Sequence, residues 1–230
     1  MSGLSVIIPA AGSGERMGSE IPKPFIKVGD KTILHHTVSR FLNVPGIVQV
    51  IIATSEKYIP EIEAMSDSFS KGADLFKVVK GGAERQYSIY NALEYVSGQA
   101  HLVAVHDAVR PFIRKELIVE CCEVAEKVGG AVLGVPAKDT IKQVDNARMI
   151  TSTPNRAFLW QAQTPQIFRK DLLLKAYQSA LEDEYIGTDD ASLVERIGGK
   201  IQMVEGDREN LKITYPVDLK IAELIFGTDQ

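Results

Sequence analysis

A loop of small residues near the N-terminus is the first feature that could do chemistry. The apolar run 4–9 ends in the sequence Pro9-Ala10-Ala11-Gly12-Ser13-Gly14, whose backbone N–H groups can approach an anion closely because few side chains obstruct them. The loop is not a P-loop, since no Gly-Lys-Ser/Thr follows, and Met17 stands where a dinucleotide-binding loop needs its third glycine. It is therefore a candidate phosphate cradle, and an ordinary tight turn is the alternative.

Two basic residues follow this loop closely. Arg16 comes just after Gly14, and Lys23 stands between two prolines in the sequence Pro22-Lys23-Pro24. Two cations beside a backbone cradle suit a triphosphate, and the flanking prolines stiffen the segment that carries the lysine. We interpret Arg16 and Lys23 as candidate phosphate ligands, against the alternative that Lys23 is a single solvated lysine.

A second glycine turn follows the predicted strand 75–80. The sequence Gly81-Gly82-Ala83-Glu84-Arg85-Gln86-Tyr87-Ser88 leads from this turn into a helical pattern. A bare backbone can hydrogen-bond the edge of a nucleotide base, and Ser88 offers a hydroxyl group nearby. Gly82 and Ser88 are therefore candidate base-binding residues, although a glycine turn at a helix N-terminus explains the same residues equally well.

An acidic residue ends the predicted strand 101–106. Asp107 begins the sequence Asp107-Ala108-Val109-Arg110-Pro111, at a place where a parallel sheet meets a metal ion or a substrate hydroxyl group. The alternative is a structural ion pair between Asp107 and Arg110. His106 is expected on the packed side of the strand rather than in the chemistry.

Four further polar residues fall in loops or at the ends of elements: Thr140, Arg156, Thr188 and Lys212, the last in a short strand pattern over residues 210–214. Each could simply be a solvated side chain, and they can form a binding site together only if the fold brings them close to one another. No nucleophile elbow, Cys/His metal set or HExxH motif accompanies them, so hydrolase chemistry has little support. Anion binders around one carboxylate fit phosphoryl or nucleotidyl transfer, where catalysis is mainly positioning and charge neutralisation.

The elements that must position these residues follow an alternating order. Short β-branched runs recur at intervals too long for hairpins, at residues 4–9, 47–54, 75–80, 101–106, 131–135 and 200–204. Amphipathic helical patterns lie between most of these runs, among them 32–42 and 116–128. The alternation predicts an α/β fold, in which a mainly parallel sheet is sandwiched by helices and ligands bind beyond the carboxyl ends of the strands.

One segment breaks the alternation. Residues 138–163 have the pattern of a polar-faced hairpin with a turn at Asp145-Asn146, inserted between two core elements. An isolated hairpin is marginal in water, so this one must pack on something, either a second subunit or its own domain. The later helices are predicted over residues 170–182, over 189–197 with Thr188 as the cap, and over 216–226.

Composition bounds the classes of function. The 230 residues are 45% hydrophobic and 24% charged with a formal net charge of -4, which is enough for one sizeable core and argues against a general nucleic-acid binder. We expect one domain over residues 1–230, because no linker or repeat divides the chain. The two cysteines, Cys121 and Cys122, are neighbours that cannot bridge without severe strain, which indicates a reduced protein. The apolar runs are strand-length and the N-terminus lacks the basic region of a signal peptide, so we expect no membrane association and a cytoplasmic location.

The motifs together resemble one family. Similarity to the 2-C-methyl-D-erythritol 4-phosphate cytidylyltransferases covers essentially the whole chain, and rests on the motifs above with Asp139-Thr140, Gln163-Thr164-Pro165-Gln166, Thr188-Asp189-Asp190-Ala191-Ser192 and the segment 204–212. The resemblance implies a Rossmann-like nucleotidyltransferase fold with a β-arm, and a homodimer whose arms exchange. It also implies a reaction with Mg²⁺ in the non-mevalonate route to isoprenoids, in which CTP and 2-C-methyl-D-erythritol 4-phosphate give 4-diphosphocytidyl-2-C-methyl-D-erythritol and pyrophosphate.

The resemblance implies roles for the candidate residues. Arg16 and Lys23 resemble the family's transition-state stabilisers, while Arg156 and Lys212 resemble the pair that orients the methylerythritol phosphate. The groups implied to hold CTP are Ser88 and the main chain of Ala10, Ala11, Gly12, Ser13, Gly14 and Gly82. The groups implied to meet the substrate or the metal are Asp107, Arg110, Thr140 and Thr188, with Asp107 as the candidate Mg²⁺ ligand.

Two alternatives stay open. Ribitol-5-phosphate cytidylyltransferases share most of these motifs, but more often begin the first loop with Ala-Gly-Gly where this chain has Pro9-Ala10-Ala11-Gly12. A non-catalytic nucleotide-binding sensor is the alternative of another class, and the presence of both Arg16 and Lys23 argues against it. Ala83 departs from the acidic residue that many relatives carry after Gly-Gly, which weakens base contacts here if that residue acts through its carboxylate.

Overall fold

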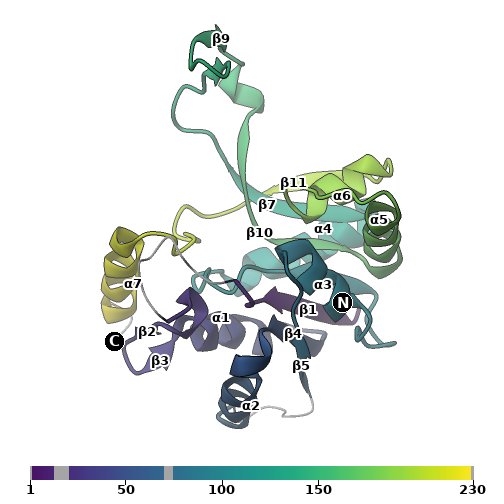
Figure 1. Cartoon of the computed structure of the whole chain (residues 1–230), viewed down its shortest axis with the longest axis vertical. Helices are drawn as coiled ribbons and strands as arrows, with labels where there is room; N and C mark the ends of the chain where they lie inside the picture. Colours follow the sequence, from purple (N-terminus) through teal and green to yellow (C-terminus); the bar gives the residue numbers. More distant parts are fainter. Residues whose placement is uncertain (1, 13–20, 70–74, 229–230) are drawn as a thin grey trace.

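The computed structural model describes residues 2–12, 21–69 and 75–228, and these are built around one seven-stranded sheet with the strand order β11-β7-β10-β6-β1-β4-β5 (Figure 1). The strands of this sheet are β1 (Leu4–Pro9), β4 (Ile47–Thr54), β5 (Phe76–Lys80), β6 (Leu102–Val105), β7 (Gly130–Pro136), β10 (Trp160–Arg169) and β11 (Ile201–Glu205). β1, β4, β5 and β6 pair in parallel, as do β7 and β11, so the predicted mainly parallel α/β sheet is confirmed.

β10 is the exception, because it runs antiparallel to both of its neighbours, β6 and β7. The sequence pattern did not predict this strand. Its register with β7 shifts between Ala162 and Gln166, and Pro165 lies inside that irregularity. A proline cannot donate a backbone hydrogen bond to the neighbouring strand, so in sheets it is confined to edge strands and bulges. A proline inside a sequence segment therefore argues against predicting a central strand there.

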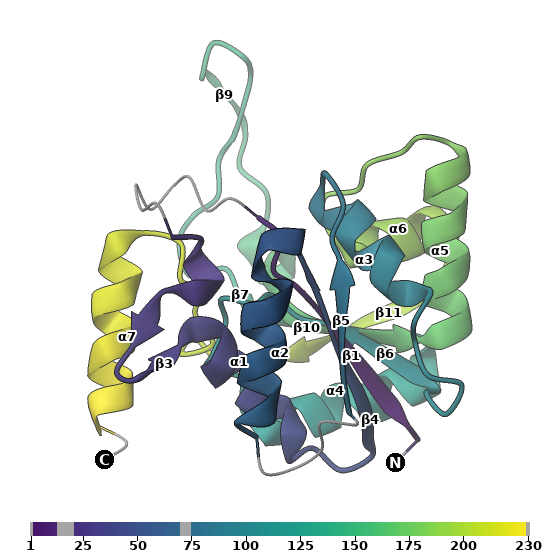
Figure 2. The ribbon, with the colours of Figure 1, turned by 60° about the horizontal axis from the view of Figure 1, so that its bottom comes forward.

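Helices cover both faces of the sheet, as predicted (Figure 2). One face carries α1 (Ile33–Leu42), α2 (Ile59–Asp67) and α4 (Lys115–Val128), and the other carries α3 (Arg85–Leu93), α5 (Lys170–Glu182) and α6 (Asp190–Arg196). β1 contributes to the cores on both faces of the sheet. Val6 and Ile8 pack with α1, α2 and α4, and Ile7 packs with α3, α5 and α6. This period of two lets a buried central strand be apolar on both sides.

A third, smaller core lies beside the sheet. Val28, Ile33, Phe112, Ile213 and Ala222 form it. They come from the short strand β2 (Lys27–Val28), the start of α1, the loop before α4, the segment before α7 and the helix α7 (Pro216–Thr228). β2 pairs with a second short strand, β3 (Lys31–Thr32). The 3₁₀ turn η2 (Lys23–Phe25) comes immediately before β2, so this core holds the N-terminal turn against the C-terminal segment.

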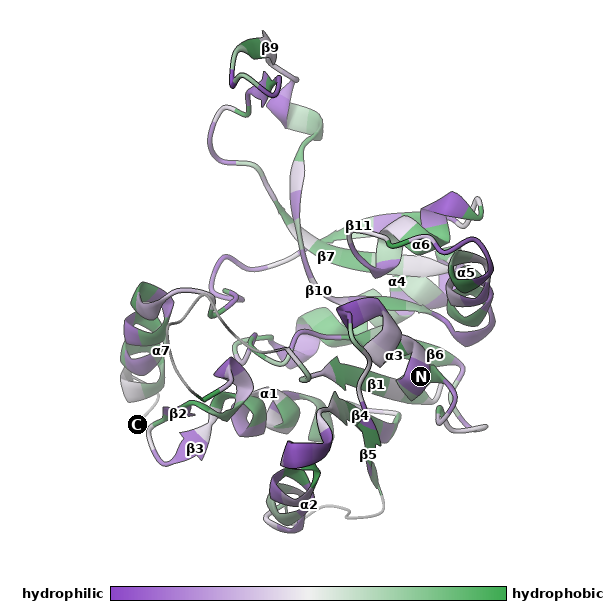
Figure 3. Ribbon diagram, viewed as in Figure 1, coloured by the Kyte–Doolittle hydropathy of each residue, from purple (hydrophilic) through white to green (hydrophobic). Residues whose placement is uncertain are grey.

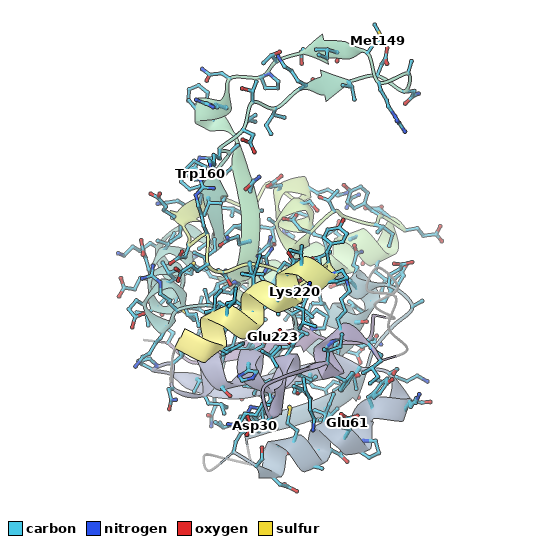
Figure 4. The ribbon with its side chains drawn as sticks, turned by 90° about the vertical axis from the view of Figure 1, so that its left-hand side faces the viewer. Asp30, Glu61, Met149, Trp160, Lys220 and Glu223 are labelled. Carbon is cyan, nitrogen blue, oxygen red and sulfur yellow. The ribbon has the colours of Figure 1, made fainter. Side chains whose placement is uncertain are left out.

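The segment 138–163 forms an arm that stands clear of the body (Figure 1). It contains β8 (Gln143–Val144), β9 (Ile150–Ser152) and the 3₁₀ turn η5 (Arg156–Phe158), and Figure 4 places Met149 near its tip and Trp160 near its base. The turn that follows Asp145 is present, because the Asp145 carboxylate accepts hydrogen bonds from the backbone N–H groups of Ala147 and Met149.

The arm exposes large apolar side chains as well as its polar ones. Met149, Ile150 and Phe158 are 66%, 62% and 81% exposed, and Figure 3 shows the apolar stretches along the arm. Of these three residues only Ile150 lies in a strand, because β8 and β9 are two and three residues long.

Two further details of the predicted elements were wrong. Asp189 rather than Thr188 caps α6, because the Asp189 side chain accepts a hydrogen bond from the backbone of Ser192 and Ser192 returns one to the backbone of Asp189. Residues 210–214 form no strand. The other predicted helices match α5 and, at its N-terminus, α7. Within the described residues, no helix is both long and apolar enough to cross a membrane.

Candidate active site

A cavity of about 410 Å³ opens at the carboxyl ends of β1, β5 and β6. This is the edge of the sheet where the parallel topology predicts a ligand site. Its described walls come from five segments of the chain, which contribute residues 9–12 after β1, Lys23 and Pro24, residues 82–85 with Ser88, residues 107–109 after β6, and Lys212 with Ile213.

The two glycine-containing loops lie against each other in this cavity. A Cβ atom on Gly81 would come 2.6 Å from the Cβ atom of Ala11, and one on Gly82 would come 2.4 Å from that of Tyr87. Both positions therefore need glycine for close approach. The Ser88 hydroxyl accepts a hydrogen bond from the backbone N–H of Gly82 at 3.0 Å and donates to the carbonyl of Glu84 at 3.1 Å. Ser88 thus fixes the glycine turn.

Asp107 lies within a cluster of cations at the floor of the cavity. Its Oδ2 atom is 3.0 Å from Nζ of Lys212 and 3.3 Å from Nε of Arg110, and its Oδ1 atom is 3.5 Å from Nε of Arg85. The backbone N–H of Asp107 donates to the hydroxyl group of Thr164 at 3.0 Å. The carboxylate is held from several sides, and the ion pair with Arg110 that the sequence left open is present.

Electrostatics keep this cluster charged. Burial raises the pKa of a carboxyl group, but the cations of Arg85, Lys212 and Arg110 outweigh it and hold the pKa of Asp107 well below its usual range. Burial likewise works against the charged form of Arg85, yet Asp190 and Asp107 raise its pKa above the ordinary value. Cations outnumber carboxylates along the cavity floor, which suits an anionic ligand.

Lys23 brings a further cation to the cavity. Its side chain is only 7% exposed, and Nζ donates a hydrogen bond to the backbone carbonyl of Thr214 at 2.7 Å. Pro22 and Pro24 flank it, and the N–H of Phe25 closes the turn onto the carbonyl of Pro22. The sequence alternative of a solvated lysine is therefore wrong, because this ammonium group is held inside the protein.

Comparison with known proteins identifies the family. The model of the IspD family, 2-C-methyl-D-erythritol 4-phosphate cytidylyltransferase, matches residues 4–228. The chain belongs to this family. It is 42% identical over 224 residues to the 2-C-methyl-D-erythritol 4-phosphate cytidylyltransferase of Caldanaerobacter subterraneus subsp. tengcongensis, covering 96% of this chain and 97% of that protein. It is 43% identical over 229 residues to the protein of the same name from Clostridioides difficile, covering 98% and 94%.

Solved structures give the same result. The crystal structure of 4-diphosphocytidyl-2C-methyl-D-erythritol synthase from Anaerococcus prevotii matches with a TM-score of 0.88 at 29% identity, covering 98% of this chain and 96% of that one. The 2-C-methyl-D-erythritol 4-phosphate cytidylyltransferase of Francisella tularensis matches with a TM-score of 0.80 at 33% identity, covering 97% and 99%. The chain is therefore a nucleotidyltransferase enzyme with the Rossmann-like fold of this family, and the sensor alternative is wrong.

The fold brings many of the predicted site residues to one place. The cavity is lined by Ala10, Ala11, Gly12, Lys23, Gly82, Ser88, Asp107 and Lys212, and Arg110 joins it through Asp107. Three other candidates do not line it in this chain. Thr140 and Arg156 lie on the arm, where Arg156 donates to the carbonyl of Lys138 at 3.0 Å, and Thr188 lies exposed before α6. Ser13, Gly14 and Arg16 lie outside the described residues.

Three charged residues at the site were not among the predicted ones, and one of them, Glu84, lines the cavity next to Arg85. Arg85 lines the cavity from the first turn of α3, and Asp190 binds Arg85 from the first turn of α6. Both fall inside motifs that the sequence analysis quoted. Their pairing spans 105 residues of sequence, so spacing alone could not reveal it.

The donor set bears on how a divalent metal ion would be held. Among the described residues, no group of three or more His, Cys, Asp or Glu side chains could hold an ion. Mg²⁺ at phosphate-transfer sites commonly takes one or two carboxylates and completes its shell with substrate phosphates and water. Asp107 fits that minimal role as a single oxygen donor, but three cations already surround it. The ion would therefore depend mainly on the phosphates of a bound nucleotide.

Proposed function

We propose that this cavity binds CTP and 2-C-methyl-D-erythritol 4-phosphate and transfers the cytidylyl group between them. A phosphate oxygen of the acceptor forms a bond to the α-phosphorus of CTP, and the bond from that phosphorus to the bridging oxygen breaks, which releases pyrophosphate. The observation that carries the proposal is the convergence in one cavity of glycine-lined backbone with Lys23, Arg85 and Lys212, the last two paired with Asp107, in a member of this family. The step belongs to isoprenoid precursor biosynthesis.

The backbone segments of the cavity suit the nucleotide. We assign the CTP phosphates to the loop 10–14 and the base to the glycine turn at Gly82, whose geometry Ser88 maintains. Ala83 also lines the cavity. Because alanine has no polar side chain, this position can offer a base only its main-chain groups. Base selectivity in this chain therefore depends on backbone placement.

The reaction needs charge neutralisation more than proton transfer. The second pKa of a phosphate monoester is near ~6, so the acceptor is already largely a dianion at neutral pH and needs no general base. It must approach a triphosphate that carries the same sign of charge. We assign Lys23 and Arg16 to the developing charge at the α-phosphorus. Lys212 and Arg156 would hold the acceptor phosphate, and the residues assigned to the rest of the acceptor are Asp107, Arg110, Thr140 and Thr188.

Family members are typically divalent-metal dependent, and we propose Mg²⁺ as the ion. When bound with the nucleotide it would neutralise phosphate charge as a Lewis acid. Asp107 is the residue of this chain that could contribute an oxygen to it. Lys23 and Lys212 serve the same electrostatic end from fixed positions in the protein, because each ammonium group is anchored by a hydrogen bond or an ion pair.

We also propose that the enzyme is one domain that works as a cytoplasmic homodimer, with the arm as its contact. Support comes from the exposed apolar side chains of the arm and from the placement of Arg156 and Thr140 away from the cavity of their own chain. In a dimer, the partner subunit would cover the exposed apolar side chains of the arm, and each arm would supply Arg156 and Thr140 to the partner's cavity.

Pyrophosphate release tests the function directly. CTP, UTP and ATP are each offered with Mg²⁺ and either 2-C-methyl-D-erythritol 4-phosphate or ribitol 5-phosphate, and pyrophosphate is measured with a coupled assay. Fast release is expected for CTP with the methylerythritol phosphate. Comparable or faster release with ribitol 5-phosphate would overturn the acceptor, and release with UTP or ATP at the same rate would overturn the assignment of base selectivity.

A further inference from the structure

Asp190 is a buried carboxylate that reaches the active site only through another residue. It is the first residue of α6, it is 1% exposed, and it does not line the cavity. Its Oδ1 and Oδ2 atoms accept hydrogen bonds from Nη1 and Nη2 of Arg85 at 3.2 Å and 2.9 Å. This two-pronged contact fixes both the position and the plane of the guanidinium group.

The carboxylate itself is held rigidly. The hydroxyl group of Tyr177, which is 2% exposed on α5, donates to Oδ1 of Asp190. Burial and the Asp190 carboxylate raise the pKa of Tyr177 well above its usual value, so the phenol remains a donor. Gln166 on β10 ties down the start of α6, because its side-chain amide donates to Asp189 and its amide oxygen accepts from the backbone N–H of Ala191.

Arg85 passes this constraint on to the cavity. With its two terminal nitrogens bound to Asp190, the remaining Nε faces Oδ1 of Asp107 at 3.5 Å. The other oxygen of Asp107 is left to Lys212 and Arg110. The carboxylate is thus divided, with Arg85 on one oxygen and Lys212 on the other. The Arg85 side chain is 36% exposed, and among its described contacts only Asp190 binds the two terminal nitrogens of the guanidinium group.

We infer that Asp190 is a positioning residue for the transfer reaction, which holds Arg85 so that Asp107 stays shared between Arg85 and Lys212. If Asp190 is lost, the freed guanidinium closes on the nearest remaining carboxylate, Asp107, and competes with Lys212 for it. Lys212 and Arg85 then leave the places that the substrates need. The inference rests on the proposed function of the cavity, and a misplacement of this kind commonly costs about a hundredfold in rate.

Three variants separate positioning from support of the fold. Asp190→Asn removes the carboxylate that binds both terminal nitrogens of Arg85, Arg85→Gln leaves the buried Asp190 without its cation, and the double variant removes both charges together. Unpaired buried charge destabilises, whereas removing both partners is close to neutral. We therefore expect both single variants to unfold at lower temperature than the wild type and the double variant to recover most of the loss. Arg85→Lys adds a control, because one ammonium group cannot bind Asp190 at two points and reach Asp107.

The kinetic readouts are kcat and KM for each substrate by pyrophosphate release, with the affinity for CTP and Mg²⁺ measured by calorimetry. All four variants are expected to lose about tenfold or more in kcat/KM for the methylerythritol phosphate, and the double variant is expected to stay impaired although its stability returns. Recovery of activity with stability in the double variant would show that the pair serves only the fold. Wild-type kinetics in Asp190→Asn would overturn the inference as well.

Failure of the proposed function is recognised separately. It would appear as a wild-type enzyme that releases no pyrophosphate from CTP and the methylerythritol phosphate. The calorimetric comparison would then still decide the inference, since a cavity arranged by Asp190 should lose affinity for CTP and Mg²⁺ by about tenfold in Asp190→Asn and in the double variant. Unchanged affinity in both would overturn it.

Discussion

Lys23 is buried at the cavity although lysine side chains are almost never fully buried unless they are paired. Its ammonium group donates a hydrogen bond to the carbonyl of Thr214 at 2.7 Å, which fixes its position beside the cavity. A fixed charge costs no reorganisation when negative charge develops during transfer. We therefore expect Lys23 to act in the transition state rather than in ground-state binding.

Replacing Lys23 by Ala should lower kcat by about a hundredfold or more, the scale of losing one preorganised donor, while KM for the acceptor changes little. Arg16→Ala is expected to behave alike. Lys220→Ala, which alters an exposed lysine of α7 (Figure 4), is the matched control. Steady-state pyrophosphate release measures both parameters. A variant with near wild-type kcat and a raised KM would assign Lys23 to substrate binding instead.

The buried side chain of His106 should make the stability of the protein depend on pH. Its ring is fully buried, Nε2 lies 3.0 Å from the carbonyl of Arg110, and burial lowers its pKa from the ordinary 6.5 to about 4. The unfolded chain therefore takes up a proton between these values that the folded chain refuses. The contribution of the neutral His106 ring to the free energy of unfolding is therefore fully present above pH 6.5. It falls as the pH drops towards 4, by up to about 3 kcal/mol.

Urea unfolding across this pH range checks the prediction. The wild type should lose stability on acidification, and His106→Gln should lose less over the same range, whatever its stability at neutral pH. His101→Gln, which alters an exposed histidine at the start of the strand region, is the control. Equal slopes in the wild type and His106→Gln would remove His106 as the source of the acid sensitivity.

Individual residues were predicted from sequence where type and local spacing sufficed. Lys23 between prolines and Asp107 after a buried strand needed only their neighbours and the rule for parallel sheets. Asp190 and Arg85 needed the pairing of α3 with α6, which no local pattern contains. Ser88 was predicted as a base-binding residue and does line the cavity, but its hydroxyl group is hydrogen-bonded to the glycine turn. A sequence cannot say which of several nearby partners a hydroxyl group binds.

At the scale of elements, the glycine turn between β5 and α3 shapes the end of the cavity that we assign to the nucleotide. Gly82→Ala should weaken CTP binding by about tenfold or more, because its Cβ atom would lie 2.4 Å from that of Tyr87 and the turn must shift. Gly98→Ala is a matched control, since its Cβ atom would meet nothing within 4 Å. Calorimetry with CTP and Mg²⁺ measures the effect, and wild-type affinity in Gly82→Ala would contradict it.

The regular elements followed from hydrophobic period, and the irregular ones did not. α5 was predicted because its apolar residues recur at helical spacing, with Leu173, Ala176, Tyr177 and Ala180 buried on one side. β10 escaped because Pro165 interrupts it at a register shift. The cap of α6 was misplaced by one residue because Thr188 and Asp189 are both good capping residues, and only the backbone conformation of Asp189 decides between them.

At the scale of the whole molecule, the arm exposes large apolar side chains that a second subunit could cover. Phe158 is 81% exposed and Met149 66%, on a segment whose two short strands pair only with each other. We expect a dimer by light scattering at micromolar concentration. Phe158→Ser together with Met149→Ser should shift it towards monomer, whereas Leu224→Ser, on the 70% exposed Leu224 of α7, should not. If the wild-type protein were a monomer at this concentration, the prediction would be wrong.

Exchange of arms makes a further prediction, because Arg156 would then serve the partner's cavity while Lys23 and Lys212 serve their own. An inactive Arg156→Ala chain mixed with an inactive Lys23→Ala chain forms a dimer in which one site carries both defects and the other carries none. Random pairing makes half the dimers mixed, each with one intact site, so activity should return to about a quarter of the wild-type level.

The control for this experiment mixes Lys23→Ala with Lys212→Ala. Both lesions then lie in the cavity of their own chain, so every site in the mixed dimer keeps one defect and activity should not return. Subunit exchange is verified by mass spectrometry in both mixtures. If the Arg156→Ala mixture exchanges and remains inactive, Arg156 acts in its own chain, where it now bonds the carbonyl of Lys138, and each active site is complete within one subunit.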